Sequence, residues 1–128
     1  MNKKVDYLEK NLSRINKALI DSLPKKNFSE ITEAIHYSVM NGGKRMRPQL
    51  MLLMAESLKV EVKNKTIDLM AAAGELIHCY SLIHDDLPAM DDDDFRRGKP
   101  SCHKKFSEAV AILACLLYTS PSPRDVCS

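Results

Sequence analysis

The segment from about Thr66 to His84 constrains the fold of this chain more than any other feature. It contains no proline, and a helix formed by it would be apolar almost all round, apart from Glu75 and a few small polar residues. A helix that is apolar on every side is normally buried. We therefore expect a central helix that needs neighbours on all sides, and the other helices expected here are too few to surround it.

Four further segments have the apolar spacing, caps and stops that are typical of helices. The first carries one apolar stripe and is ended by Pro24; its stripe consists of Val5, Leu8, Leu12, Ile15 and Leu19. The others run from near Ser29 to Met40 with Gly42-Gly43 as the stop, from Pro48 to Leu58, and from after Pro100 through Leu113. No segment has the strict alternation of a half-buried strand. The predicted fold class is all-α, a partial helical bundle.

The composition is that of an ordinary globular chain without a strong global charge. Of 128 residues, 45% are hydrophobic and 28% charged, and the net charge is +2, so nothing indicates nucleic acid or a membrane surface. The charged start lacks the apolar region of a secretory signal, and no apolar run is long enough to span a bilayer. We expect one small cytoplasmic domain whose four cysteines, which lack metal-binding spacing, are reduced thiols.

An acidic run follows the apolar segment directly. Asp85, Asp86 and the four aspartates from Asp91 to Asp94 place six carboxylates within ten residues. Like charges this close repel one another unless cations lie between them. Ligands that offer only oxygen suit hard ions such as Mg²⁺. A solvated acidic loop remains the alternative.

The positions of Pro88 and His78 predict how the acidic run is arranged in space. Asp85 and Asp91 are out of line on an ideal helix, but Pro88 must end or distort the helix and can bring Asp91 back toward Asp85. His78 precedes Asp85 by seven residues, which places both on one helix face, about 10.5 Å apart along the axis. His78 therefore lines a pocket, or it is a hydrogen-bonded core residue.

Two groups of cations flank the acidic run. Gly42-Gly43-Lys44-Arg45-Met46-Arg47-Pro48 places cations at the mouth of a helix, where unpaired N–H groups also favour a diphosphate. A glycine-terminated helix followed by surface cations would have the same sequence. Arg96 and Arg97 either neutralise the acidic run or bind phosphates that are bridged to metal ions.

In this combination the chain resembles the trans-prenyltransferases, the isoprenyl diphosphate synthases, over about residues 4–114. Gly42 to Pro48 is similar to the first basic motif of the family. The first aspartate-rich motif of the family is similar to Asp85-Asp86-x-x-x-x-Asp91 followed by Arg96-Arg97-Gly98. The residues here are closest to those of the bacterial farnesyl diphosphate synthases. The resemblance implies a bundle of many helices around a deep cavity, of the isoprenoid synthase type.

The resemblance also implies roles for individual residues. Isopentenyl diphosphate would be bound by Lys44, Arg47, His78 and Arg97. Mg²⁺ would be held by Asp85, Asp91 and the further motif member Asp86, and Arg96 would contact the allylic diphosphate. Tyr80 and Ser81, the fifth and fourth positions before the first aspartate, would help to set product length, although core packing would also explain Tyr80.

The implied activity is condensation of isopentenyl diphosphate with dimethylallyl or geranyl diphosphate, with release of diphosphate. The resemblance implies a farnesyl product and a homodimer for the full-length protein. A synthase that makes geranylgeranyl or longer products is the first alternative. A non-catalytic helical module that binds ions or phosphorylated ligands is the second.

The chain departs from the family after Ala114. We interpret residues 1–114 as the N-terminal part of a synthase domain, and residues 115–128 as a non-family tail with two prolines and three serines after Leu117. Cys115 to Asp125 can be encoded by a transposase adapter used to prepare sequencing libraries, so we interpret the tail as artefactual; a genuine flexible tail is the alternative. The second aspartate-rich motif of the family is absent from these 128 residues, and we expect the chain as written to be inactive.

Overall fold

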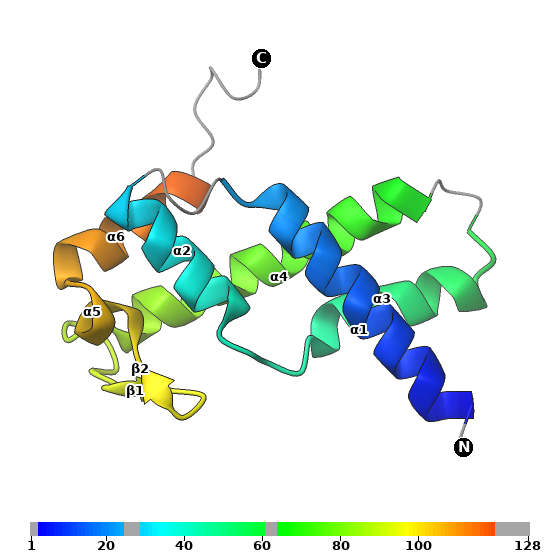
Figure 1. The fold of residues 1–128 in the computed structure, drawn as a ribbon, viewed down its shortest axis with the longest axis horizontal. Coiled ribbons are helices and arrows are strands. Elements are labelled where there is room, and N and C mark those ends of the chain that lie inside the picture. Colours follow the sequence, from blue (N-terminus) through cyan, green and yellow to red (C-terminus); the bar gives the residue numbers. More distant parts are fainter. Residues whose placement is uncertain (1–2, 25–28, 61–63, 120–128) are drawn as a thin grey trace, which may run out of the picture. The chain divides into compact units, whose positions relative to one another are not determined.

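The computed structural model describes residues 3–24, 29–60 and 64–119 (Figure 1). Its helices are α1 (Lys3–Ser22), α2 (Glu30–Met40), α3 (Met46–Ser57), α4 (Asn64–Asp86), α5 (Cys102–Lys105) and α6 (Glu108–Thr119). The strands described are β1 (Phe95–Arg96) and β2 (Lys99–Pro100), which pair as an antiparallel hairpin. The all-α class predicted from the sequence is confirmed. The chain divides into two compact units, Met1–Leu23 with Gly43–Leu76, and Pro24–Gly42 with Ile77–Ser128.

The first unit contains α1, α3 and the part of α4 up to Leu76, and α1 packs against α3. Ile15 and Leu19 of the predicted stripe are buried, together with Leu52 of α3. Val5 and Leu8, on the same stripe, are exposed. Helix α1 is thus amphipathic, as predicted. The apolar side chains in the N-terminal half of its stripe are exposed to solvent.

Helix α4 begins two residues before and ends two residues after the predicted segment. It buries Ala71, Ala72, Cys79 and Ile83, yet several of its large apolar side chains are exposed, among them Leu69, Met70 and Ile77. The sequence expectation that too few helices are present to surround this segment is therefore confirmed.

A buried ion pair fixes the start of α3 in the first unit. Arg45 has left-handed backbone geometry (φ 51°) and lies at the N-cap of α3 without a capping side-chain bond. Its Nη1 donates to Oε1 of Glu75 on α4 at 3.0 Å, and the two side chains are only 2% and 3% exposed. Its Nε donates to Oδ1 of Asn16 on α1. The pair therefore joins the three helices of the unit immediately beside Lys44.

We expect Glu75→Ala to lower the free energy of unfolding of the chain by about 3–5 kcal/mol, because it leaves the Arg45 guanidinium buried without its counter-ion. Urea denaturation measures the loss. Glu9→Ala, which removes an exposed carboxylate from α1, is the matched control and should change stability by no more than about 0.5 kcal/mol. Equal effects of the two substitutions would show that the pair is not what holds the three helices together.

The second unit contains α2, the C-terminal part of α4, the hairpin, α5 and α6. Helix α2 packs against α6 and α5 (Figure 1). Ser29 caps α2 as predicted, because its hydroxyl accepts from Thr32 N while Thr32 Oγ1 accepts from Ser29 N. Tyr37 of α2 meets Phe106 edge to face, with ring centroids 5.6 Å apart. These contacts hold α2 beside the segment that follows the hairpin.

The helix predicted after Pro100 is interrupted, so a single helix there was the wrong prediction. The chain leaves α5 at Phe106 (φ −111°, ψ −91°), and Ser107 Oγ accepts from Val110 N to start α6. Helix α6 then continues past Ala114 to Thr119, with Ala114 and Cys115 buried. The prediction therefore ended the helix too early. Residues 120–128 are outside the described part of the chain.

Three cysteines of the second unit are reduced and buried in the described part of the chain. Cys79, Cys102 and Cys115 form no disulfide with one another, as predicted for these three; Cys127 lies outside the described residues. Burial raises the pKa of the Cys115 thiol to about 11, with a smaller contribution from Cys102. A thiol with a raised pKa is a poor nucleophile at neutral pH, and the buried Cys115 side chain is part of the core.

Candidate functional site

The acidic run folds back over the C-terminal end of α4. The last carbonyl groups of a helix have no partners within it, and here amide groups of the following loop supply them. Asp91 N donates to the Asp85 carbonyl at 2.8 Å, and Asp93 N donates to the Asp86 carbonyl at 3.1 Å. Leu87 N donates to the His84 carbonyl. The turn around Pro88 thus returns the chain to Asp85, as the sequence predicts.

This loop places carboxylates at the negative end of a helix, where they are electrostatically unfavourable. Asp91 is exposed, and the carboxylate of Asp85 is half exposed, 3.5 Å from His84 Nδ1. Their backbones are held together by the hydrogen bond between Asp91 N and the Asp85 carbonyl. Both carboxylates are therefore accessible oxygen donors, one on the last turn of α4 and one on the loop that follows it, and a cation between them would relieve the repulsion.

Asp86 has a different environment from its neighbours. Its carboxylate is 3% exposed and accepts two hydrogen bonds from Arg96, from Nε at 3.1 Å and from Nη2 at 2.5 Å. These hydrogen bonds raise the pKa of the Arg96 guanidinium above its usual value. Both carboxylate oxygens of Asp86 thus accept hydrogen bonds from Arg96, and two predicted site residues bind each other. The place of Asp86 among the metal ligands stays a prediction.

Arg96→Ala should destabilise the chain more than Asp86→Asn. The first leaves a buried carboxylate without a partner, at a cost of about 3 kcal/mol or more. The second should cost about 1–2 kcal/mol, because the Arg96 side chain is 34% exposed and can be hydrated. Denaturant unfolding of the single and double variants measures both values, and the double variant should recover part of the loss of Arg96→Ala. The reverse order would contradict this account of the pair.

Arg97 lies at the tip of the hairpin. Arg97 and Gly98 both have positive φ, 55° and 78°, which is the two-residue turn that suits tightly paired antiparallel strands. The exposed Arg97 side chain donates from Nη1 to the Gly42 carbonyl at 2.5 Å. Adjacent arginines therefore have different partners, with Arg96 bound at the base of the acidic loop and Arg97 bound at the end of α2.

The other predicted substrate residues lie near the ends of helices. Lys44 and Arg47 are exposed at the start of α3 in the first unit, and the Lys44 carbonyl accepts from Gln49 Nε2. His78 is partly buried on α4, and its carbonyl accepts from Ser81 Oγ. Ser81 is exposed, whereas Tyr80 is buried and its carbonyl accepts from the Cys115 thiol at 3.7 Å. Their substrate and product-length roles stay predictions.

The structure brings together a group that sequence reasoning missed. Asp92, Asp94 and His103 each offer a ligand atom, and these atoms lie within 4.8 Å of one another. In the part of the chain that the structure describes, this is the one such group of three, and Asp85, Asp86 and Asp91 do not form another. The signal available in the sequence was a histidine nine residues after Asp94, but only the hairpin brings it back to the loop.

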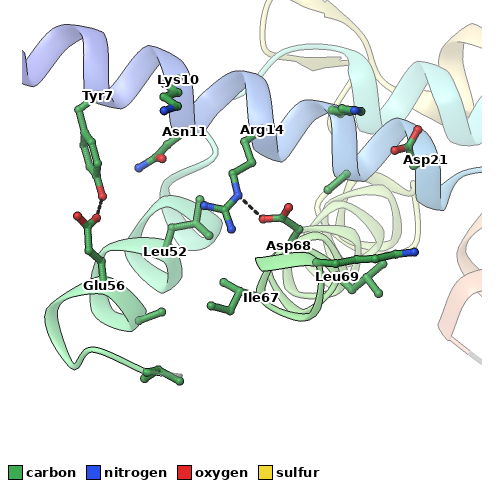
Figure 2. A pocket seen from close by; sticks show the side chains of 15 residues that line it. Tyr7, Lys10, Asn11, Arg14, Asp21, Leu52, Glu56, Ile67, Asp68 and Leu69 are labelled. Carbon is green, nitrogen blue, oxygen red and sulfur yellow. Dashed lines mark hydrogen bonds and ion pairs between the residues drawn. The ribbon is translucent and has the colours of Figure 1, made fainter. Parts of the chain in front are cut away.

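The cavities do not coincide with the predicted site residues of the first unit. A cavity of about 900 Å³ lies among α1, α3 and α4, and an ion pair and a hydrogen bond join residues that line it (Figure 2). Arg14 Nε donates to Asp68 Oδ1 there, and Tyr7 donates to Glu56. A second cavity of about 20 Å³, beside Asp86 and Arg96, has room for about one water molecule.

Comparison with known proteins shows which family this chain is similar to. The family model for Polyprenyl synthetase matches residues 28–122. Farnesyl diphosphate synthase of Escherichia coli (strain K12) is 52% identical over 110 residues, which cover 84% of this chain and 36% of that protein. The large subunit 1 of the heterodimeric geranylgeranyl pyrophosphate synthase of Arabidopsis thaliana, which is chloroplastic, is 46% identical over 86% of this chain and 29% of its own length.

Solved structures agree with the sequence comparison. A geranyltranstransferase from Thermotoga maritima superposes with a TM-score of 0.82 at 39% identity, over 88% of this chain and 42% of that chain. A geranyltransferase from Legionella pneumophila gives a TM-score of 0.79 at 46% identity, over 88% and 40%. The described fold is therefore that of an isoprenoid synthase.

The chain belongs to the polyprenyl synthetase family. It spans about 36% of the length of the first curated relatives that it matches. The matched range extends past Ala114 and includes the last turns of α6; the tail boundary placed at Ala114 stays a prediction. Among the residues that the structure describes, no helix is both long and apolar enough to cross a membrane.

Proposed function

We propose that these residues are the N-terminal part of an isoprenyl diphosphate synthase of the farnesyl type. The observation that supports it most is the folded acidic loop, where the Asp91 amide is bonded to the Asp85 carbonyl. This bond holds the first and last aspartates of the motif on one turn, with accessible carboxylates. The relatives named farnesyl diphosphate synthase share this part of the chain at about half of its positions.

Asp85 and Asp91 fit a magnesium ion by the chemistry of their donors. Both offer carboxylate oxygens, which Mg²⁺ prefers together with substrate phosphates. When bound, Mg²⁺ would neutralise charge on the departing diphosphate. Asp86 would act on this site through Arg96, because both of its oxygens accept from that guanidinium.

The cations of the chain have separate tasks in this proposal. Arg96 donates to Asp86 from Nε and from one Nη2 proton. Because a guanidinium has five N–H donors, its other N–H groups remain for the allylic diphosphate. Lys44, Arg47, His78 and Arg97 would bind isopentenyl diphosphate. The reaction is ionisation of the allylic diphosphate, attack by the isopentenyl double bond on the allylic cation, and loss of a proton. The homodimer and the cytoplasmic location expected from the sequence stay predictions.

In the full-length protein, Asp85→Ala or Asp91→Ala should lower turnover by about 10² or more, because each removes a ligand of the ion that stabilises the leaving group. Steady-state prenyl transfer at saturating Mg²⁺ measures the effect. Asp93→Asn is the matched control, since it removes an exposed charge from the same loop but none of the proposed ligands. Near-normal turnover of Asp85→Ala would refute the assignment.

Tyr80→Ala in the same full-length protein should shift the products toward longer chains. Tyr80 is buried in the second unit, so removing its ring opens space beside α4 that a growing chain could enter. Mass spectrometry of the products, with Ser81→Ala as a smaller change on the neighbouring position, tests this. Unchanged product lengths, together with lowered stability, would assign Tyr80 to core packing alone and would favour another determinant of length.

A further inference from the structure

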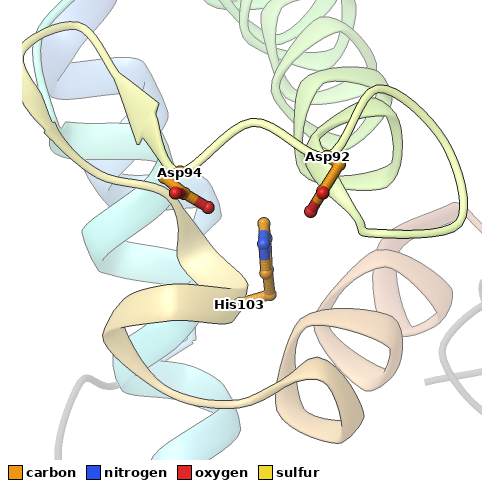
Figure 3. Close-up of side chains that lie close together, drawn as sticks. All are labelled: Asp92, Asp94 and His103. Carbon is orange, nitrogen blue, oxygen red and sulfur yellow. The ribbon is translucent and has the colours of Figure 1, made fainter.

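We propose that Asp92, Asp94 and His103 form a second cation site, which takes a divalent transition-metal ion such as Zn²⁺. The site is separate from the proposed Mg²⁺ site at Asp85 and Asp91 and does not rest on the proposed function. Figure 3 shows the His103 ring standing between the two carboxylates, which approach it from opposite sides. Their ligand atoms lie within 4.8 Å of one another.

His103 distinguishes this group from an ordinary acidic loop. The residue is only 6% exposed, and its Nε2 is buried without a hydrogen-bond partner. A buried polar atom without a partner costs about 1–3 kcal/mol, so such an atom calls for a partner such as an ordered water molecule or an ion. A metal ion at Nε2 would satisfy it.

The hydrogen bonds around His103 favour a free lone pair on Nε2. Ser101 Oγ lies 2.8 Å from the Asp93 carbonyl and 3.3 Å from His103 Nδ1. A hydroxyl has one proton, and the carbonyl can only accept, so the Ser101 proton goes to Asp93. In the neutral imidazole, the Ser101 oxygen then accepts from Nδ1–H, and the lone pair lies on Nε2. This is the arrangement in which a metal-binding histidine is held by a second hydrogen bond.

The donor set selects the kind of ion. One imidazole nitrogen with two carboxylates suits Zn²⁺ and similar borderline ions, whereas Mg²⁺ prefers oxygen throughout. Metal–ligand bonds of about 2.0–2.2 Å require the three atoms to close in slightly from their present spacing. Lys104 Nζ, 3.4 Å from Asp94 Oδ1, is half exposed and can move into water when the ion binds.

Titration of the metal-free 128-residue chain with Co²⁺, a spectroscopic substitute for Zn²⁺, tests the site directly. We expect a visible ligand-field absorption that Zn²⁺ abolishes and that excess Mg²⁺ does not. Asp92→Asn and Asp94→Asn, both at exposed positions, should each weaken Co²⁺ affinity by about 10–100-fold. His103→Gln should do the same, and circular dichroism checks that it remains folded.

Asp93→Asn is the matched control, because it removes the same charge from the adjacent exposed position and leaves its backbone carbonyl on Ser101. It should retain Co²⁺ affinity within about threefold. An equal loss in Asp93→Asn would overturn the proposal in favour of diffuse attraction to the acidic loop. Effective competition by Mg²⁺, or no ligand-field band at all, would overturn it equally.

Discussion

The charge at the C-terminal end of α4 is the constraint on which the second unit depends. The partial negative charge of a helix end meets six carboxylates there, and the loop does not simply extend into solvent. It turns back, and its amide groups donate hydrogen bonds to the last carbonyl groups of α4, while most of its carboxylates are exposed. Arg96 compensates the one carboxylate that is buried, Asp86. The remaining charge is what makes this end of the molecule suited to cations.

Local sequence patterns predicted much of the fold, because helix starts and stops are encoded within a few residues. Ser29 as a cap, Gly42-Gly43 as a stop, and Pro88 as the reason for the turn after α4 all act at short range. The break at Phe106 was missed although Ser107 and Glu108 are a start signal. There the apolar spacing on both sides of the break made one helix and two helices look alike.

The partners of the charged residues could not be predicted in the same way. Nothing in the pattern separates Asp86 from Asp85, yet one is buried against Arg96 and the other faces solvent. Nor does the pattern show that Glu75, the exception in an apolar helix, would be compensated by Arg45 across 30 positions. Such pairings depend on how helices pack, and the same holds for His103, which reaches Asp92 and Asp94 only because β1 and β2 form a hairpin.

The hairpin makes the directions of Arg96 and Arg97 depend on its length. Neighbouring positions of a strand and its turn face different ways, so Arg96 and Arg97 differ in direction rather than in chemistry. Insertion or deletion of a single residue within the hairpin would exchange the surroundings of the two arginines. A substitution at an exposed position such as Phe95 leaves this arrangement in place, whereas a change in the length of the hairpin does not.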